Sequence, residues 1–418
     1  MNRKLIGLGV VALVLALLLT LAPACGKGEG PGPGVTPTPG APGVTPTPTP
    51  QAKELKIGAL CSLSGPAATW GTEILEGIKW AADKYNATGF KVGADTYVIK
   101  IVKGDDKFIG SAAAEEIIRM ISGEGIHYVT GPIGTYAAIG PIAKEGKCFV
   151  FNVTNSELIG PHNPYLLIGA APVRTWYPTF WDQAYKFYPQ IKTVAIVTPD
   201  PTTYDPHLAS EKGAHERHGT EVVMTKRYTI FASDYYPVLT PVVAKNPDCV
   251  SFCAGNKGDI DLMIKQIREL GYRGIIASGA HGDPQSTIDV AGCKYAEGFL
   301  MNDPDYSSKL YPESTRKLYA EFQRTHPGRP LALTTYLGYG SIDLYVQAIQ
   351  KAGSTDPDEV MKVLDDPNFE FQYFGMPGVT LGGFETFGVR RCVNDEVCYS
   401  EVINCKKVMK SRAPAITP

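Results

Sequence analysis

From Lys53 onward the sequence alternates short apolar runs with segments of helical periodicity, and this alternation constrains the fold more than any other feature. The run 55–60 precedes a helical pattern over 72–85, and the run 97–102 precedes a second one over 111–121. Further strand-like runs follow at 127–130, 148–151, 193–197, 221–224, 249–252 and 274–277. Such alternation predicts an α/β fold in which parallel sheets are flanked by helices. Ligands of such sheets bind beyond the carboxyl ends of the strands.

The first fifty residues have the composition of an address and a tether. Basic Arg3 and Lys4 precede the uncharged apolar run 5–21, and small residues follow up to Cys25. This pattern resembles a bacterial lipoprotein signal peptide, which implies cleavage before Cys25 and a lipid anchor on that residue. An ordinary secretory signal and an uncleaved helix are the alternatives. Residues 25–52 are rich in proline, glycine and threonine and predict an extended tether.

The charge balance and the motifs exclude several classes of protein. A formal net charge of -2 with 20% charged residues fits neither a nucleic-acid-binding protein nor an acidic disordered chain. No Cys-x2-Cys pair, Walker A loop, Rossmann fingerprint or Gly-x-Ser-x-Gly elbow occurs, so we expect no metal and no cofactor. The segment from His215 to His218 is one residue too short for a zincin helix, and we expect a solvated helix face there.

The cysteines suggest one disulfide. Cys392 and Cys398 flank a short polar segment between two strand-like runs, and they are the best candidate pair in a compartment that permits disulfides. Cys249 and Cys253 share one predicted strand, in which four residues span about 13 Å, too far for a bridge. We expect these two to be buried thiols.

Three loops that follow predicted strands carry hydroxyl groups and helix starts, which suit a carboxylate ligand. These loops begin after the first, third and fourth strand-like runs of the first half. The alternative for each hydroxyl taken singly is that it only caps a helix. The candidate binding residues in these loops are Ser64, Trp70, Gly134, Thr135, Tyr136, Asn152 and Thr154.

Several segments together resemble the Leu/Ile/Val-binding type (type I) of periplasmic substrate-binding protein of ABC importers. The segments are 57–71, Gly77, 81–82, 86–89, 104–106, 129–132, 153–158, 233–247, 264–271 and 296–298. The resemblance covers about residues 53–387. It implies a two-lobed fold in which each lobe is a parallel sheet flanked by helices and three crossovers form the hinge. It assigns 53–172 with 302–375 to lobe 1, and 173–301 with 376–410 to lobe 2.

The resemblance also implies roles for individual residues. Thr135 and Thr154 would donate to the carboxylate of the ligand, with Asn152 nearby, and Trp70 would cover the side-chain pocket. In lobe 2, Tyr204 would close over the ligand and Asn256 would lie in a contact loop.

Amino-acid-binding members carry an acid in one lobe 2 loop, where this chain has either His281 or Asp283. Asp283 would hold an ammonium, whereas His281 would bond a neutral group or a second carboxylate. Amino-acid specificity therefore stays open. Trp176 and Trp181 allow an aromatic pocket, but their helical spacing favours core packing.

These expectations combine into a non-enzymatic function. The chain would capture a small carboxylate-bearing metabolite, which is an amino acid or an aromatic or organic acid, and deliver it to an ABC permease. It would act outside the cytoplasm as a monomer, anchored to the membrane by a lipid on Cys25, without nucleic acid. The alternatives are a ligand-sensing receptor domain and a secreted hydrolase, in which Ser62 or Ser64 would need a distant histidine.

Overall fold

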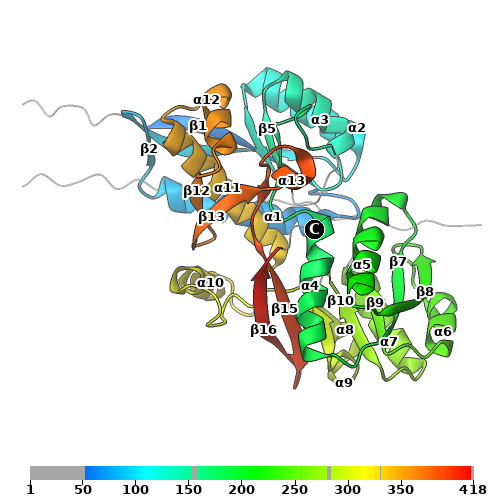
Figure 1. The fold of residues 1–418 in the computed structure, drawn as a ribbon. Coiled ribbons are helices and arrows are strands. Elements are labelled where there is room, and N and C mark those ends of the chain that lie inside the picture. The colour runs from blue at the N-terminus through cyan, green and yellow to red at the C-terminus, as the bar shows by residue number, and fades with distance from the viewer. Residues whose placement is uncertain (1–51, 153–157, 256, 280–283, 330, 416–418) are drawn as a thin grey trace, which may run out of the picture. The chain divides into compact units, whose positions relative to one another are not determined.

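Two β-sheets, each flanked by helices, make up the folded part of the chain (Figure 1). The computed structural model describes residues 52–152, 158–255, 257–279, 284–329 and 331–415. Each strand-like run of the sequence overlaps a strand, and both helical patterns lie in helices. The predicted two-lobed α/β fold is thereby confirmed. Within the described residues, no helix has the length and apolar character needed to cross a bilayer.

The first sheet, with the helices packed on it, is called the first lobe. Within the described residues its nine strands follow the order β12-β13-β14-β6-β5-β4-β1-β3-β2. The strands are β1 (Lys53–Cys61), β2 (Phe90–Val92), β3 (Asp95–Asp105), β4 (Tyr128–Thr130), β5 (Phe149–Asn152), β6 (Leu166–Ile168), β12 (Glu370–Tyr373), β13 (Met376–Gly382) and β14 (Cys392–Val393). The helices of this part of the chain are α1 (Ala68–Asn86), α2 (Gly110–Ile118) with the π-helical turn η1 (Arg119–Gly123), α3 (Tyr136–Glu145), α10 (Glu313–Thr325), α11 (Leu333–Ala352), α12 (Pro357–Asp365) and α13 (Phe384–Phe387).

The second sheet, with its helices, is called the second lobe. Its seven strands within the described residues follow the order β16-β15-β11-β10-β9-β7-β8. The strands are β7 (Thr193–Pro199), β8 (Glu221–Tyr228), β9 (Cys249–Phe252), β10 (Ile275–Ser278), β11 (Phe299–Met301), β15 (Glu396–Ile403) and β16 (Lys406–Pro414). The helices are α4 (Val173–Phe187), the 3₁₀ turn η2 (Thr202–Tyr204), α5 (Asp205–Arg217), α6 (Tyr236–Ala244), α7 (Lys257–Glu269), α8 (Pro284–Ala291) and α9 (Cys293–Ala296).

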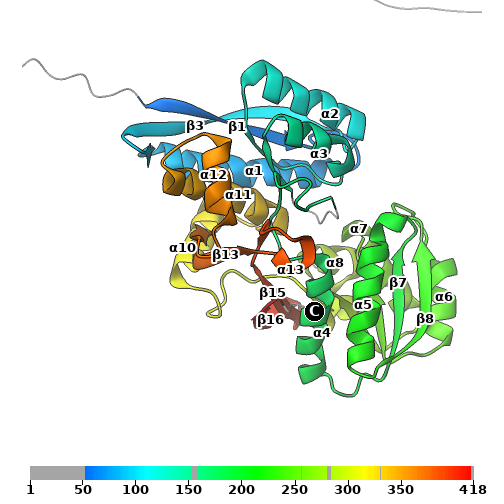
Figure 2. The ribbon, with the colours of Figure 1, turned by 45° about the horizontal axis from the view of Figure 1, so that its top comes forward.

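Successive residues of the central strands point into two different cores. In β5, Phe149 and Phe151 join the core that includes α1 and α11, whereas Val150 joins the core that includes α2 and α3. Side chains alternate between the faces of a strand, so a strand covered on both faces reads as a continuous apolar run. A Cβ at Gly77 of α1 would lie 2.0 Å from the carbonyl oxygen of Thr335 in α11. The two helices therefore lie side by side at backbone distance (Figure 2).

The third crossover lies later in the chain than the sequence predicted. Leu381 of β13 pairs with Val393 of β14, and Cys392 pairs with Ile168, all within the first sheet. Residues 376–393 thus belong to the first lobe, and the chain changes sheets at Asn394 and Asp395 before β15. The predicted boundary at 375 is wrong because β13 and β14 extend the edge of the first sheet. These additions, with β2, β15 and β16, make both sheets mixed rather than wholly parallel.

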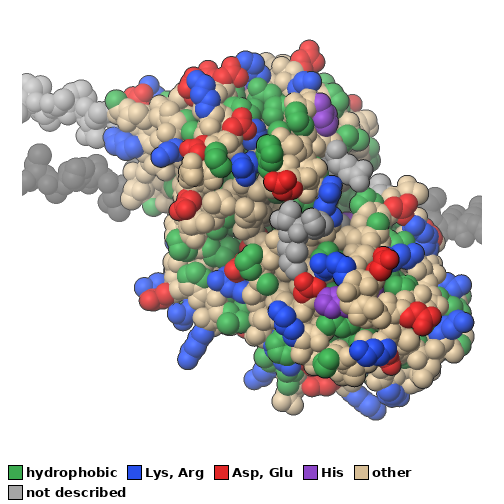
Figure 3. Space-filling model, in the orientation of Figure 1, with side chains coloured by type: hydrophobic (Ala, Val, Ile, Leu, Met, Phe, Trp, Pro, Cys, Tyr) green, Lys and Arg blue, Asp and Glu red, His purple; other side chains and the backbone are tan. Residues whose placement is uncertain are grey.

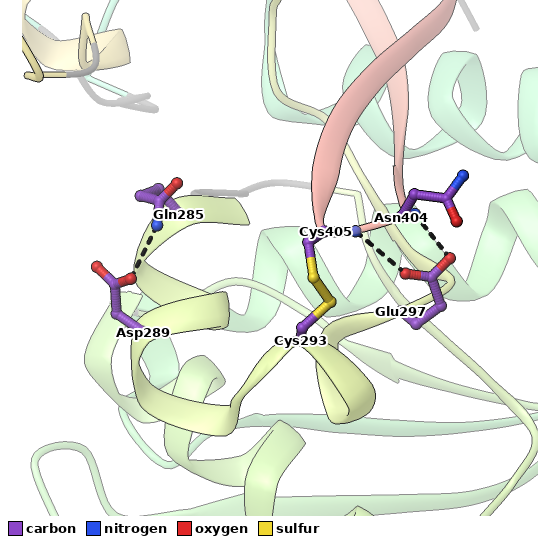
Figure 4. The surroundings of a disulfide bond; sticks show 6 residues. All are labelled: Gln285, Asp289, Cys293, Glu297, Asn404 and Cys405. Carbon is purple, nitrogen blue, oxygen red and sulfur yellow. Dashed lines mark hydrogen bonds between the residues drawn. A yellow bond between two sulfur atoms is a disulfide. The ribbon is translucent and has the colours of Figure 1, made fainter.

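The disulfide joins Cys293 to Cys405, with 5.2 Å between their Cα atoms. It links the start of α9 to the turn between β15 and β16 (Figure 4), where the Glu297 carboxylate accepts hydrogen bonds from two backbone N–H groups of that turn. The predicted pair of Cys392 and Cys398 is wrong. Cys392 lies in the first sheet and Cys398 in the second, on opposite sides of the third crossover, and both are buried free thiols.

Candidate functional site

The loops after β1 and β3 are tied together by Asp105. Its Oδ1 atom accepts hydrogen bonds from the backbone N–H groups of Leu63 at 2.8 Å, Ser64 at 3.2 Å and Lys107 at 3.0 Å. Its Oδ2 atom accepts from the Ser64 hydroxyl at 2.7 Å. Partial burial opposes ionisation, but these hydrogen bonds hold the pKa of Asp105 below its ordinary value. The hydroxyl of Ser64, a predicted ligand contact, is therefore engaged within the loop network.

Asp106 connects three loops at the same edge of the sheet. Its carboxylate accepts from the Ser62 hydroxyl at 2.5 Å, from the Phe108 backbone N–H at 2.9 Å and, more weakly, from the Thr135 hydroxyl at 3.4 Å. The side chain is fully buried, and burial raises its pKa although the hydrogen bonds oppose the shift. Asp106 was not among the residues predicted for the site. Its signal was the Gly-Asp-Asp segment directly after a strand.

Four of the residues predicted in the loops after β4 and β5 lie within the described part of the chain, and they differ in what their side chains contact. Thr135 is buried at the start of α3 with its hydroxyl toward Asp106, whereas the Tyr136 hydroxyl donates to the Leu167 carbonyl at 2.6 Å and is engaged in the core. Gly134 has a φ of 67°, and a Cβ there would lie 3.1 Å from the Phe108 ring. Asn152 is fully buried at the end of β5.

Trp70 lies in the first turn of α1, beside the β1–α1 loop. Its ring is half-buried against the core of the first lobe. At the next position, a Cβ on Gly71 would lie 2.0 Å from the Ser62 carbonyl oxygen, so only glycine allows the helix to start so close to that loop. The close contact places Trp70 at the edge that Asp105 and Asp106 organise.

The corresponding edge of the second lobe carries aromatic rings. Tyr204 ends η2, the turn after β7, and its ring centroid lies 6.1 Å from that of His207 in the first turn of α5. His207 also lies 6.2 Å from the Trp176 ring, and its Nδ1 atom is 3.3 Å from the Tyr177 hydroxyl. We call Trp176, Tyr177, Tyr204 and His207 the ring cluster. Sequence reasoning missed His207, whose one local signal is its place three residues after Tyr204.

Burial determines the ionisation of the ring cluster. It lowers the pKa of His207 to about 4, although the charge of Glu211 opposes the shift. Burial, with the charge of Asp259, raises the pKa of Tyr204. The imidazole and the phenol are therefore both neutral at neutral pH, and they present polar atoms without charge.

One ion pair joins the two lobes at these edges. Glu73 of α1 and Lys257, the first residue of α7, lie 4.0 Å apart, and the Glu73 carboxylate also accepts from the Thr334 hydroxyl. Helices α1 and α7 follow the carboxyl ends of β1 and β9, so the carboxyl edges of the two sheets face each other. The predicted residues Thr154, Asn256, His281, Asp283 and Cys25 lie outside the described residues.

The His215 segment differs from its prediction. His215 is fully buried, with its Nδ1 atom 2.7 Å from the Tyr185 hydroxyl, so the expected solvated face is wrong for this residue. His218 is exposed and lies 2.6 Å from Asp182. Trp181 is fully buried in the core under α4, which confirms core packing for that ring, and Cys249 and Cys253 are buried thiols as predicted.

Two cavities flank the crossovers, and no predicted site residue lines either of them. A cavity of about 240 Å³ lies between α8, the Pro304–Tyr306 stretch and the β15–β16 turn. Another of about 250 Å³ is lined by Asp395, Glu396 and Arg412 at the third crossover. Basic and acidic side chains are interspersed on the face shown in Figure 3, in keeping with the net charge of -2.

Comparisons with known proteins agree with this architecture. The family model described as "Periplasmic binding protein" matches residues 54–383. The Leu/Ile/Val-binding protein homolog 8 of Brucella abortus is 24% identical over 342 residues, which cover 75% of this chain and 81% of the relative. The Leu/Ile/Val-binding protein BraC3 of Rhizobium johnstonii is also 24% identical, over 321 residues covering 74% of this chain and 82% of the relative.

Two solved structures share the fold at lower identity. The branched-chain amino acid transporter substrate-binding protein LivJ of Streptococcus pneumoniae, in complex with isoleucine, has a TM-score of 0.71 at 16% identity, covering 87% of this chain and 99% of its own. A solute-binding protein of an ABC transporter from R. palustris, in complex with benzoate, has a TM-score of 0.71 at 18% identity, covering 87% of this chain and 98% of its own.

Proposed function

Because the chain belongs to the periplasmic binding protein family, we propose that it captures a small carboxylate-bearing metabolite between its lobes and delivers it to an ABC permease. The observation that carries this proposal is the loop edge tied by Asp106, which faces the second lobe across the Glu73–Lys257 pair. Such an edge presents a helix start and the weakly held Thr135 hydroxyl to an anion, without needing a metal or a cofactor. The function is capture and release, with no bond made or broken in the ligand.

The carboxylate of the ligand would bind at the start of α3, next to Thr135 and the predicted contacts Asn152 and Thr154. The partial positive charge of a helix N-terminus favours an anion there. Trp70 would cover the remainder of the ligand from the first lobe, and Tyr204 would close over it from the second. Asp283 or His281 would then decide between an ammonium-bearing and a neutral or doubly acidic ligand.

The class of ligand extends from amino acids to aromatic acids. The solved structures of similar fold include one in complex with isoleucine and one in complex with benzoate. Both molecules carry a carboxylate next to an apolar body, which is the combination that a polar first-lobe edge and an aromatic second-lobe edge would recognise.

We place the protein outside the cytoplasm, held to the membrane by a lipid on Cys25 and a proline-rich tether, and acting as a monomer. A Cys25→Ala variant should lose its lipid mass and leave the membrane fraction. An unchanged membrane fraction would contradict the anchor while leaving the binding function intact.

Calorimetry on protein stripped of carried-over ligand tests the binding function. We expect one class among amino acids, aromatic acids and dicarboxylates to bind, and at a hundred times its dissociation constant to stabilise the fold by about 2.7 kcal/mol. Thr135→Val and Trp70→Leu should each weaken that ligand at least tenfold. Thr240→Val, which removes an exposed hydroxyl from α6, is the matched control and should bind normally.

Absence of binding by every class would contradict solute capture. Binding that survives both Thr135→Val and Trp70→Leu would contradict the location of the site. Delivery to a permease is tested in cells, where deletion of the gene should abolish uptake of the ligand that calorimetry identifies. Uptake that persists unchanged would separate binding from transport.

A further inference from the structure

The ring cluster lies at the carboxyl ends of three neighbouring strands of the second sheet. Tyr204 follows β7, the thiol of Cys253 just after β9 lies 3.5 Å from the Tyr177 hydroxyl, and a Cβ on Gly279 just after β10 would lie 2.9 Å from the Tyr177 ring. Lys257, which follows β9, contacts Glu73 of the first lobe. The cluster is therefore on the edge of the second lobe that meets the first.

Three polar ring atoms of the cluster have no hydrogen-bond partner within the described part of the chain. They are the Tyr204 hydroxyl, the Trp176 Nε1 atom and the His207 Nε2 atom. The other ring nitrogen of His207 faces the Tyr177 hydroxyl, so the imidazole is held by one nitrogen and offers the other. None of the three is among the fully buried side-chain atoms that lack a partner, so each of them is reached by solvent and is open to a ligand.

Trp176 differs from Trp181, which lies five positions further along α4. Trp181 is a core ring, whereas Trp176 lies at the surface of the edge. Trp181 is fully buried and packs 4.3 Å from the His215 ring. Trp176 is only half-buried and faces His207 at the end of the sheet. Both rings pack on the core of the second lobe, as predicted, but part of the Trp176 indole ring stays accessible.

The charges near the cluster favour a ligand whose distal end is uncharged. Asp259 accepts from the Tyr235 hydroxyl and from the Phe231 backbone N–H, and Asp205 pairs with Arg227. Glu211 accepts from the Ser251 hydroxyl beneath the cluster. Asp205 and Asp259 thus have protein partners, whereas the buried Glu211 carboxylate keeps one oxygen, Oε2, without a partner within the described residues. A cation in the cluster would compete with Arg227 for Asp205, whereas a neutral hydroxyl would fit the neutral imidazole and phenol.

Resting on the proposed function, we infer that the ligand is an aromatic carboxylic acid with a ring hydroxyl, whose ring packs against Trp176 and Tyr204 and whose hydroxyl bonds His207 Nε2. Flat rings stack or pack edge-on with favourable geometry, and a neutral imidazole can donate to or accept from a phenol. A hydroxyphenyl group is common to a hydroxybenzoate and to tyrosine. The first-lobe edge would hold the carboxylate in either molecule.

Titration calorimetry with 4-hydroxybenzoate, benzoate, tyrosine, phenylalanine and leucine tests this inference. We expect at least one hydroxyphenyl acid to bind tenfold or more tightly than its partner without the hydroxyl, because a site built for a hydroxyl rejects the analogue lacking it. Preference for 4-hydroxybenzoate over tyrosine, or the reverse, shows whether the protein binds the hydroxyphenyl group of a benzoate or that of an amino acid. Leucine should bind more weakly than either.

The variants are designed to separate the hydroxyl from the ring. His207→Phe keeps an aromatic ring and should remove the preference for the hydroxyl, with little change for benzoate or phenylalanine. Trp176→Leu should weaken all the aromatic acids tenfold or more. His218→Phe, at an exposed histidine of the same lobe, is the matched control. If His207→Phe fails to fold, His207→Asn takes its place, and a thermal melt checks that this second variant is folded.

The outcomes distinguish this inference from the proposed function. Tighter binding of leucine than of every aromatic acid overturns the inference and leaves solute capture intact. An unchanged hydroxyl preference in His207→Phe also overturns it. If none of the five acids binds and the wider screen of carboxylates is also empty, the proposed function fails, and the inference fails with it.

Discussion

The two edges that face each other are built in opposite ways. In the first lobe, Asp105 and Asp106 accept hydrogen bonds from backbone and hydroxyl groups of three loops, and most polar atoms there already have protein partners. In the second lobe, the rings of Trp176, Tyr204 and His207 offer polar atoms that have no partner within the described residues. The first edge is held by its own hydrogen bonds, whereas the second is, on our inference, completed by the ligand.

The largest expected effect tests what holds the second lobe together away from that edge. Replacing Cys293 and Cys405 with serine removes a bridge that spans a sequence separation of 112 residues. The unfolded chain gains conformational freedom, so we expect the free energy of unfolding to fall by about 4 kcal/mol. Urea denaturation followed by circular dichroism measures the change.

The unsubstituted protein under reducing conditions is the control for this prediction. Dithiothreitol should shift its urea midpoint to that of the double variant and should leave the double variant unchanged. Equal midpoints for the oxidised protein and the double variant would contradict the prediction. They would show that the hydrogen bonds to Glu297 hold the β15–β16 turn in place without the bridge.

The next effect tests the fixed edge of the first lobe. Asp106→Ala leaves the buried Ser62 hydroxyl and the partly buried Phe108 backbone N–H without their acceptor. We expect a loss of about 3 kcal/mol in the free energy of unfolding, since each unsatisfied buried group costs about 1–3 kcal/mol. Ligand affinity should fall at least tenfold, because the β1–α1 and β4–α3 loops lose their common anchor.

Asp182→Ala is the matched control for Asp106→Ala. Asp182 pairs with Arg217 and His218 on the surface of the second lobe. Exposed pairs of this kind contribute about 0–1 kcal/mol. If Asp106→Ala proved no more harmful than Asp182→Ala, the first edge would not depend on its buried acid, and the contrast between the lobes would be lost.

The sequence predicted the features that depend on local pattern. Strand β5 was predictable from the sequence because both of its faces are covered by a core. Phe149, Val150 and Phe151 are therefore all apolar and form one continuous run. The loops at the carboxyl ends followed from the strands, and Thr135 was found there.

Features that depend on distant pairing could not be read in the same way. Cys392 and Cys398 look like partners along the chain, but a change of sheet at Asn394 separates them. The bridge forms instead between cysteines 112 positions apart, and connectivity of that kind is not encoded in spacing. Asp106 and His207 were missed for the same reason, because their roles come from loops and rings that only the fold brings near them.

A third effect tests whether other buried acids stabilise the first lobe as Asp106 does. Asp343 of α11 is buried, accepts from the Tyr85 hydroxyl and the Phe374 backbone N–H at 2.9 Å each, and has its pKa raised to about 7 by burial. An unfolded aspartate has a pKa of about 3.9. Between these two values the folded protein binds a proton that the unfolded chain does not, so stability falls as pH rises from about 4 to 7.

Asp343→Asn removes this titration. The free energy of unfolding of the unsubstituted protein, minus that of the variant, should decrease by about 3 kcal/mol from pH 4.5 to pH 8. Urea denaturation at several pH values measures the difference. A pH-independent difference would show that Asp343 keeps the same charge in both states, and that burial does not govern this acid.

The smallest effect tests the contact between the two edges. The Glu73 and Lys257 side chains are 19% and 22% exposed and lie 4.0 Å apart, so part of their attraction is screened by water. Glu73→Gln should weaken ligand affinity about two- to fivefold, because the pair favours the form in which the lobes meet.

Glu76→Gln on the same helix is the matched control, since Glu76 pairs with His326 and Arg329 on its own side of the molecule. Equal loss of affinity in the two variants would mean that α1 acts through the stability of the first lobe alone. A loss confined to Glu73→Gln, and diminished at high salt, would mean that the two edges are coupled by charge as well as by ligand.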